Sequence, residues 1–319
     1  MHSKAPPTFL FVEGGTAFAE LEGRHFADCR KDDPMNSPTQ ETTQAEAHFA
    51  PVEAWDAIAA GYDEFVAPGE AALATAALKL AGLRQGHRFL DVAAGTGGLS
   101  LPAARLGAKV IATDWSPKMI AHLNARIKDE RLPDAEGKVM DCHTLDFADD
   151  TFDLTGSLFG VMLVPDQLGA LREMVRVTKP GGRVLLTAYG SPSEFEGIQF
   201  FISALRAVNP AFEGLPSNPP PLEFQVADPE VMRRRLTAAG LRDVTVDTMH
   251  QEKLELGSGE QLWRWCLGSN PIPGMLVADL TEAQKATMLS RIDDMIRARL
   301  NENGVAVLSA PLNIGIGTK

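Results

Sequence analysis

A short segment of the chain combines a carboxylate with closely spaced glycines. Asp91 ends an apolar run, and Gly95 and Gly97 follow it in the pattern Asp-x-x-x-Gly-x-Gly. Glycines at these positions let the backbone approach a ligand closely and adopt angles that a Cβ atom would oppose. Exposed N–H groups at the start of the next helix favour a negatively charged or polar ligand group. An ordinary turn between a strand and a helix can use the same glycines, so this motif needs support from other residues.

A second carboxylate, Asp114, supplies that support. It follows the apolar run 109–113, and an acid about twenty residues after such a loop can accept hydrogen bonds from both hydroxyls of a ribose. A dinucleotide fingerprint requires Gly-x-Gly-x-x-Gly or Ala directly after the strand. This chain has Ser100 at the last of these positions. Both a nicotinamide dinucleotide and a single adenosyl group are compatible with these residues as ligands. The missing third glycine favours the adenosyl group.

Alternating strands and helices must position these residues. The pattern predicts helices at 54–60, 71–83, 99–106, 117–130 and 166–177, and strands at 88–92, 109–113, 138–140, 151–159 and 183–189. Repeated strand–helix units predict a parallel sheet with helices on both faces. Right-handed crossovers then place the carboxyl ends of all these strands on one edge. Asp91 and Asp114 are expected to meet at that edge.

Further segments strengthen one interpretation. The chain resembles class I S-adenosylmethionine-dependent methyltransferases, in the small-molecule branch that resembles ubiquinone and menaquinone biosynthesis methyltransferases. The likeness rests on the glycine loop and on Met140–Asp153, Ser157–Met162 and Arg176–Arg183, and it covers about residues 50–190. It implies an α/β fold, a Rossmann-like doubly wound sheet of seven strands. The sheet should be mostly parallel with an antiparallel last strand near 305–316, and helical cap insertions should accompany it.

The resemblance also implies the cofactor, S-adenosyl-L-methionine, and its contacts. Asp91 would hold the methionine ammonium, Asp114 the ribose hydroxyls and Asp141 the adenine amine. Because Asp114 is expected only to face the cleft, its replacement by alanine should weaken cofactor binding and leave stability nearly unchanged. The cofactor-binding residues that the resemblance implies are Tyr62, Asp91, Gly95, Thr96, Gly97, Asp114, Trp115, Met119, Asp141, Cys142 and Leu158.

The domain organisation follows from changes in composition. Residues 1–47 are expected to form a disordered or loosely attached extension, because they are polar and lack periodicity. Residues 48–319 are expected to form a single methyltransferase domain that starts with lid helices at 48–84. Two segments rich in aromatic residues and proline, 190–226 and 257–303, break the strand–helix rhythm and are expected to form cap insertions.

The expected reaction is methyl transfer to a small, apolar or aromatic acceptor by in-line displacement. The catalytic residue is unknown, and His143, Tyr189 and His250 are weak candidates for a base. No metal is expected, because Asp166 has the position of a helix N-cap and no histidine–cysteine cluster is seen in the sequence. The alternatives are a non-catalytic S-adenosylmethionine-binding regulator and an NAD-dependent oxidoreductase.

Composition limits the partners. The chain has 30 lysines and arginines against 42 aspartates and glutamates, so its formal net charge is −12. That balance argues against nucleic acid as a binding partner, because neutralising its phosphates requires clustered basic residues. The sequence contains no run of about 18 apolar residues, so it predicts no membrane span. We expect a cytoplasmic protein that acts on a small-molecule methyl acceptor, and the sequence leaves a homodimer open.

Overall fold

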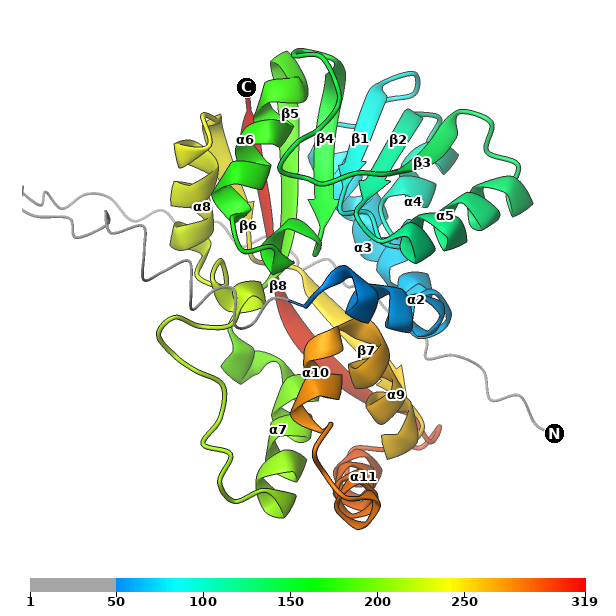
Figure 1. Ribbon diagram of the computed structural model, residues 1–319, viewed down its shortest axis with the longest axis vertical. Coiled ribbons are helices and arrows are strands. Elements are labelled where there is room, and N and C mark those ends of the chain that lie inside the picture. Colours follow the sequence, from blue (N-terminus) through cyan, green and yellow to red (C-terminus); the bar gives the residue numbers. More distant parts are fainter. Residues whose placement is uncertain (1–49) are drawn as a thin grey trace, which may run out of the picture.

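The computed structural model describes residues 50–319, which form one central sheet with helices around it and a cap at one end (Figure 1). The extension predicted at 1–47 lies outside the described residues. The strands are β1 (Arg88–Val92), β2 (Lys109–Asp114), β3 (Ala135–Val139), β4 (Phe152–Leu158), β5 (Thr178–Tyr189), β6 (Arg242–Asp247), β7 (Gln251–Leu256) and β8 (Ala306–Thr318). The helices are α2 (Val52–Phe65), α3 (Ala67–Leu80), α4 (Ser100–Arg105), α5 (Pro117–Asp129), α6 (Gln167–Val177), α7 (Glu196–Val208), α8 (Pro229–Ala238), α9 (Gly259–Ser269), α10 (Pro271–Leu276) and α11 (Glu282–Arg297).

The main path of the sheet has the order β3-β2-β1-β4-β5-β8-β6. Strands β3, β2, β1, β4 and β5 pair in parallel, whereas β8 is antiparallel to both β5 and β6. The central strands are buried on both faces, as strands covered by crossover helices must be; Phe89 and Leu90 of β1 are fully buried. The predicted seven strands with an antiparallel last strand are confirmed.

An eighth strand, β7, was not predicted. It pairs with the first half of β8, from Gln251 opposite Pro311 to Leu256 opposite Ala306, while the second half of β8 lies between β5 and β6. The two runs predicted near 305–316 are therefore a single strand of 13 residues. This long strand extends beyond the main sheet and connects it to the cap.

The cap consists of α7, β7, α9, α10, α11 and the first half of β8. It lies beyond the ends toward which the parallel strands point, with α2 between it and the sheet (Figure 1). A second hydrophobic core fills it, separate from the core under the sheet, and includes Phe201, Leu262, Trp265 and Ile292. The division into one domain with lid helices and two insertions stays a prediction.

The sheet topology creates a crevice between β1 and β4. The chain moves from β1 to β2 and β3 on one side, then returns to β4 and β5 on the other. Ligands of open α/β sheets bind in the crevice at such a switch point, outside the carboxyl ends of the strands. Asp91, near the end of β1, lies in register with Ala112 of β2 and Gly156 of β4. Within residues 50–319, every helix is too short or too polar to span a bilayer.

Candidate active site

The glycine loop after β1 begins with a buried carboxylate. Asp91 is completely buried, and its Oδ2 accepts a hydrogen bond from Ser100 Oγ over 2.5 Å. Its Oδ1 has no hydrogen-bond partner among the described residues. Burial raises the pKa of Asp91 to about 8, an effect that the Ser100 bond opposes and the nearby Asp114 and Glu70 increase. Burying a carboxyl group without a partner costs folding free energy. The unpaired Oδ1 of Asp91 therefore indicates a ligand that offers a hydrogen-bond donor or a positive charge.

Asp114 ends β2 and holds the glycine loop in place. Its Oδ2 accepts a hydrogen bond from the Gly95 N–H and its Oδ1 accepts one from the Ser116 N–H, both over 2.9 Å. The Trp115 N–H also donates to this carboxylate. A carboxylate has about four acceptor positions, so it can still accept a hydrogen bond from a ligand hydroxyl. Gly95 itself has a φ of +54°, the left-handed region that glycine favours. The carboxylate and the loop are thus positioned by each other.

Helix α2 covers this region and is fastened to α5. Asp56 accepts a hydrogen bond from Ser116 Oγ over 2.5 Å, and Asp63 forms an ion pair with Arg126 over 3.0 Å. On the inner side of α2, the Tyr62 hydroxyl donates to Glu70 Oε1 over 2.7 Å. Burial raises the pKa of Glu70 to about 7, although the Tyr62 hydrogen bond and Arg126 act in the opposite direction.

The loop after β3 supplies the opposite wall. Asp141 Oδ1 accepts a hydrogen bond from the His143 N–H over 2.9 Å and lies 2.8 Å from His143 Nδ1, while His143 Nε2 lies 3.1 Å from the Asp166 carbonyl oxygen. Asp141, Cys142 and His143 bring their potential ligand atoms within 4.8 Å of one another. Burial and the adjacent Asp141 raise the pKa of the Cys142 thiol to about 12.

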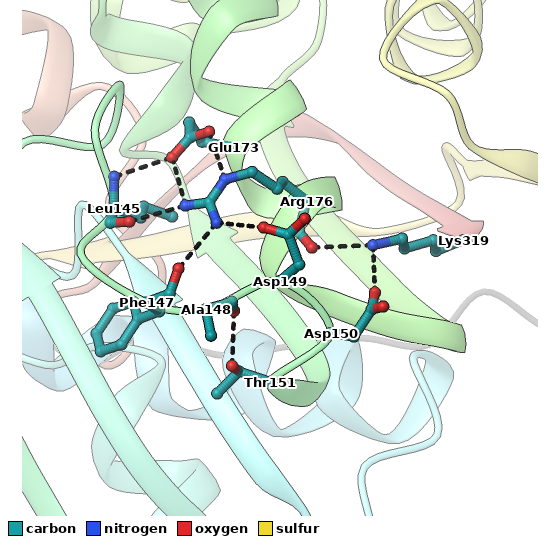
Figure 2. Close-up of polar contacts among 9 residues, drawn as sticks. All are labelled: Leu145, Phe147, Ala148, Asp149, Asp150, Thr151, Glu173, Arg176 and Lys319. Carbon is teal, nitrogen blue, oxygen red and sulfur yellow. Dashed lines mark hydrogen bonds and ion pairs between the residues drawn. The ribbon is translucent and has the colours of Figure 1, made fainter.

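Hydrogen bonds made by Arg176 connect that loop to α6 (Figure 2). Arg176 donates to the carboxylates of Glu173 and Asp149 and to the carbonyl oxygens of Leu145 and Phe147. Lys319, beside it, donates to Asp150 and to the Arg176 carbonyl oxygen. The Arg176 side chain is thus shared between one helix and several points of the loop. The segment that was recognised by its sequence pattern is held mainly by this one guanidinium.

One cavity of about 600 Å³ joins the glycine loop to the cap, a volume within the usual range for small-molecule sites. At the sheet edge its lining includes Tyr62, Glu70, Asp91, Gly95, Asp114, Trp115, Met119, Asp141, Cys142, His143 and Leu158. At the cap its lining includes Phe159, Tyr189, Phe195, Ile198, Phe201, Ile202, Leu215, Glu223, Phe224, Trp265, Ile272 and Leu276. The polar groups lie mostly at one end and the aromatic groups at the other.

Three predicted residues lie elsewhere. Thr96 is fully buried outside the cavity lining, and its carbonyl oxygen accepts from Arg126. Gly97 also lies outside the lining; a Cβ there would come within 2.4 Å of Leu123 Cδ1, so this glycine is required by packing against α5. His250 is buried between β6 and β7, with its Nδ1 3.1 Å from Asp247 Oδ1, and does not line the cavity. The structure does not support His250 as a base.

Three buried glutamates near the cavity were missed from the sequence. Glu70 stands alone as an acid on an apolar helix, a signal that the sequence does contain. Glu252 shares the inward face of β7 with Leu254 and Leu256, so the alternation would have revealed it had the strand been predicted. Glu223 lines the cavity, its Oε2 has no hydrogen-bond partner among the described residues, and burial raises its pKa.

Comparisons with known proteins agree with this geometry. The family model for a methyltransferase domain matches residues 90–186. A demethylmenaquinone methyltransferase of Streptomyces griseus is 35% identical over 170 residues, which cover 52% of this chain and 72% of that protein. The chain belongs to the class I S-adenosylmethionine-dependent methyltransferases.

Other relatives of this methyltransferase are less informative. An uncharacterized protein of Mycobacterium bovis is 45% identical over 104 residues, covering 33% of this chain and only 38% of that protein's length. Among solved structures, the YcgJ protein from Bacillus subtilis superposes with a TM-score of 0.52 at 18% identity, covering 78% of this chain and 98% of that one. At this identity the likeness concerns the fold.

The residues of this methyltransferase fit its family's cofactor, S-adenosylmethionine. The unpaired Asp91 Oδ1 suits a ligand ammonium, because a buried carboxylate is stabilised by a partner of opposite charge. The remaining acceptor capacity of Asp114 suits a ligand hydroxyl. Trp115, Met119 and Leu158 offer apolar surface for a planar ring in the same cavity.

Proposed function

We propose that this protein transfers a methyl group from S-adenosylmethionine to a small acceptor with an apolar or aromatic body. The observation that carries this proposal is the continuity of the cavity, which is lined by Asp91 and Gly95 at one end and by Phe201 and Trp265 at the other. A methyl donor bound at the sheet edge and an acceptor bound under the cap would meet inside a single enclosed space. Orientation of two reactants in such a space supplies a large part of a rate enhancement.

The proposed roles of the cofactor residues follow from their positions. Asp91 would bind the methionine ammonium, Asp114 the ribose hydroxyls and Asp141 the adenine amine. Tyr62 would cover the cofactor from α2. Once bound, the cofactor supplies a methyl group that its sulfonium already activates, so the chain itself must bind, orient and exclude water.

The cap residues would bind the acceptor. Phe195 contacts both Tyr189 and Trp265, with ring centroids 4.7 and 5.9 Å apart, and these rings form an apolar wall. Glu223 adds a carboxyl oxygen, Oε2, that has no hydrogen-bond partner within residues 50–319 and would meet a polar substituent of the acceptor. Because one relative is named demethylmenaquinone methyltransferase, a naphthoquinol is the first acceptor to test.

The decisive experiment combines binding and turnover. Calorimetric titration should show that S-adenosylmethionine binds and NAD does not. Incubation with methyl-labelled S-adenosylmethionine and naphthoquinols, phenols, amines or fatty acids should then yield one class of labelled product. Binding of NAD without S-adenosylmethionine would overturn the proposal in favour of an oxidoreductase.

A non-catalytic regulator predicts a different result. It would bind S-adenosylmethionine without transferring the methyl group to any member of the panel, and the cap side chains would plug the acceptor end. The open cavity supports the enzyme. Activity on an apolar or aromatic acceptor would exclude the regulator.

The remaining expectations belong to the same proposal. The net charge of −12 supports a protein without a nucleic-acid partner. A cytoplasmic location suits an enzyme that uses a small-molecule acceptor, and sedimentation would decide whether it is a homodimer.

A further inference from the structure

A tyrosine in the cap-facing wall of the cavity has a buried carboxylate behind it. Tyr189 ends β5 and lines the cavity, and its hydroxyl donates to Glu252 Oε2 over 3.0 Å. Glu252, on β7, is 7% exposed and does not belong to the lining of this cavity. A ligand in the cavity can therefore contact the Tyr189 side chain, whereas Glu252 lies behind it.

The tyrosine ring is held between two phenylalanines. Phe159 stacks on Tyr189 with ring centroids 4.5 Å apart, and Phe195 contacts it at 4.7 Å. Phe159 has a φ of +60°, an uncommon backbone conformation for a bulky residue. It directly follows Leu158, the last residue of β4. The Tyr189 hydroxyl is thus fixed near the strand end at which the cofactor site is expected.

Tyr189 cannot remove a proton by itself. Burial, followed by the charge of Glu252, raises the pKa of Tyr189 well above 10, so the phenol stays protonated. Burial and the charge of Glu70 raise the pKa of Glu252 to about 7, with the Tyr189 hydrogen bond acting against them. A carboxylate that titrates near neutral pH is well matched to general-base work. The tyrosine can accept a proton only if it passes its own proton to Glu252.

The other groups around Glu252 are compatible with its role as the acceptor of the Tyr189 proton. Glu70 and Tyr62, on α3 and α2, are the additional titratable groups coupled to the pair. The neighbours from β8 and the cap include Leu308, Ser309 and Ala310. Ser309 donates to Glu196, and Glu196 forms an ion pair with Arg299. His250, two residues earlier in the chain, lies against Asp247.

We propose that Tyr189 is a catalytic residue that deprotonates a phenolic acceptor, and that Glu252 is the positioning residue that receives the tyrosine proton; this rests on the function proposed above. The O–H bond of the acceptor breaks and its proton goes to Tyr189 Oη, while the original tyrosine proton goes to Glu252. The freed oxygen would form a bond to the methyl carbon while the sulfur–methyl bond of S-adenosylmethionine breaks, and the neutral thioether S-adenosylhomocysteine would leave. The acceptor thus loses one proton and gains one methyl group, and Glu252 later releases the proton to solvent.

Binding of 4-nitrophenol to the cofactor-free protein tests the proton transfer without turnover. Absorbance spectra distinguish the phenol from the phenolate of the bound probe. We expect the phenolate band in the wild type and its loss in Glu252→Gln and in Tyr189→Phe. Glu255→Gln, on the same strand but on its other face, should keep the band. A bound probe that is equally ionised in all four proteins would overturn the proposal.

The pH profile of turnover tests the same pair in catalysis. With a weakly acidic phenol, kcat of the wild type should rise through about pH 7, and Glu252→Gln should remove that rise and lower kcat by about 10²-fold or more. The loss should shrink with acidic phenols, which arrive already ionised. Tyr62→Phe, the matched loss of a buried tyrosine hydroxyl, should change the KM for the cofactor and keep the pH profile.

The outcomes separate the two proposals. If the wild type transfers no methyl group to any acceptor while the probe is still ionised by the pair, the proposed function fails and the proton relay stands. If Glu252→Gln turns over with the wild-type pH profile, the relay fails and the function stands. If Glu223→Gln removes the rise with pH instead, Glu223 is the base and the relay is wrong.

Discussion

Asp91 has a carboxylate oxygen that finds no hydrogen-bond partner in the described part of the chain, and its pKa is raised to about 8 chiefly by burial. In the free protein at neutral pH this group is therefore mostly protonated. Binding of an ammonium group requires the carboxylate, so cofactor binding should release a proton.

This gives a prediction for affinity. The Kd for S-adenosylmethionine should fall as pH rises from about 6 to about 8, by up to tenfold per unit, because each unit of pKa corresponds to about 1.4 kcal/mol. Calorimetry in buffers of different ionisation enthalpy should detect the released proton. Asp91→Asn should bind more weakly and release none, and a wild-type Kd that is flat over this range would contradict the assignment.

Asp114 supports the loop as well as facing the cavity. The expectation that Asp114→Ala would leave stability nearly unchanged is therefore wrong, because the substitution removes the acceptor for the N–H groups of Gly95 and Ser116. The pattern of the sequence indicated the acid and its spacing, but it could not show that both oxygens already accept backbone hydrogen bonds.

We expect Asp114→Ala to lower cofactor affinity by about tenfold to a few hundredfold, from bonds worth about 1.5–3 kcal/mol each. Stability should fall by about 1–3 kcal/mol as well. Asp228→Ala, which removes the N-cap of α8 away from the cavity, should cost about 1 kcal/mol of stability without changing affinity. Calorimetry and urea unfolding measure both quantities, and wild-type affinity in Asp114→Ala would refute the ribose role.

At the scale of elements, the contact between the glycine loop and α5 explains one residue that the motif alone misassigned. Gly97 has a φ of +99°, and an added Cβ would lie 2.4 Å from Leu123 Cδ1. The space beside Gly97 is occupied by α5, so this glycine serves helix packing, and Gly95, which lines the cavity, stays the proposed ligand contact.

Gly97→Ala should therefore destabilise the protein by about 2–4 kcal/mol, combining backbone strain with overpacking. Gly181→Ala is the matched control, since Gly181 also has a positive φ but has no atom within 4 Å of the added Cβ. It should lose only about 1 kcal/mol. Leu123→Ala in the Gly97→Ala background should recover part of the difference in thermal unfolding; equal losses at the two glycines would show that packing plays no part.

The elements that could be predicted are those with a clear local pattern. Apolar strands followed by acids or glycines, such as β1 and β2, and the N-caps Ser116 and Asp166 were readable. The strand β7 was not predicted because its outward residues, Gln251, Lys253 and Glu255, are polar or charged and its inward face includes the acid Glu252. Glu252 was not identified, because it lies on this strand. The pairing of Tyr62 with Glu70 depends on how α2 packs on α3, which local pattern does not encode.

At the scale of the whole molecule, burial raises the pKa values of five described carboxyl groups, which are Glu70, Asp91, Asp114, Glu223 and Glu252, and so affects the pH dependence of folding. Asp91, Glu70 and Glu252 have pKa values raised to about 8, 7 and 7. A raised pKa in the folded state gives stability that is present at low pH and is lost as pH rises through the folded value. Glu173 and Glu196 have lowered pKa values and act in the opposite direction, below the pH range in question.

We therefore expect the cofactor-free protein to be less stable at about pH 8 than at about pH 5.5, by on the order of 3 kcal/mol. Urea unfolding at the two pH values measures the difference. Glu252→Gln should reduce it, whereas Glu255→Gln should not. Greater stability at the higher pH would mean that these carboxyl groups are not buried as described.

The pairing of Leu256 with Ala306 has a consequence for how new acceptor preferences could arise. These two residues face each other across a ladder, so β7 and β8 form a hairpin, and the helices α9, α10 and α11 together occupy the place of its loop. The tips of such loops tolerate insertions better than strands do. Because α9 and α11 also pack on α2 and α7 and bury residues such as Leu262 and Ile292 in the cap core, the helices can be exchanged as one cassette only where the new cassette fills that core and its ends remain a strand spacing apart. Chimeras joined at these two residues would inherit a foreign acceptor wall while keeping their own glycine loop.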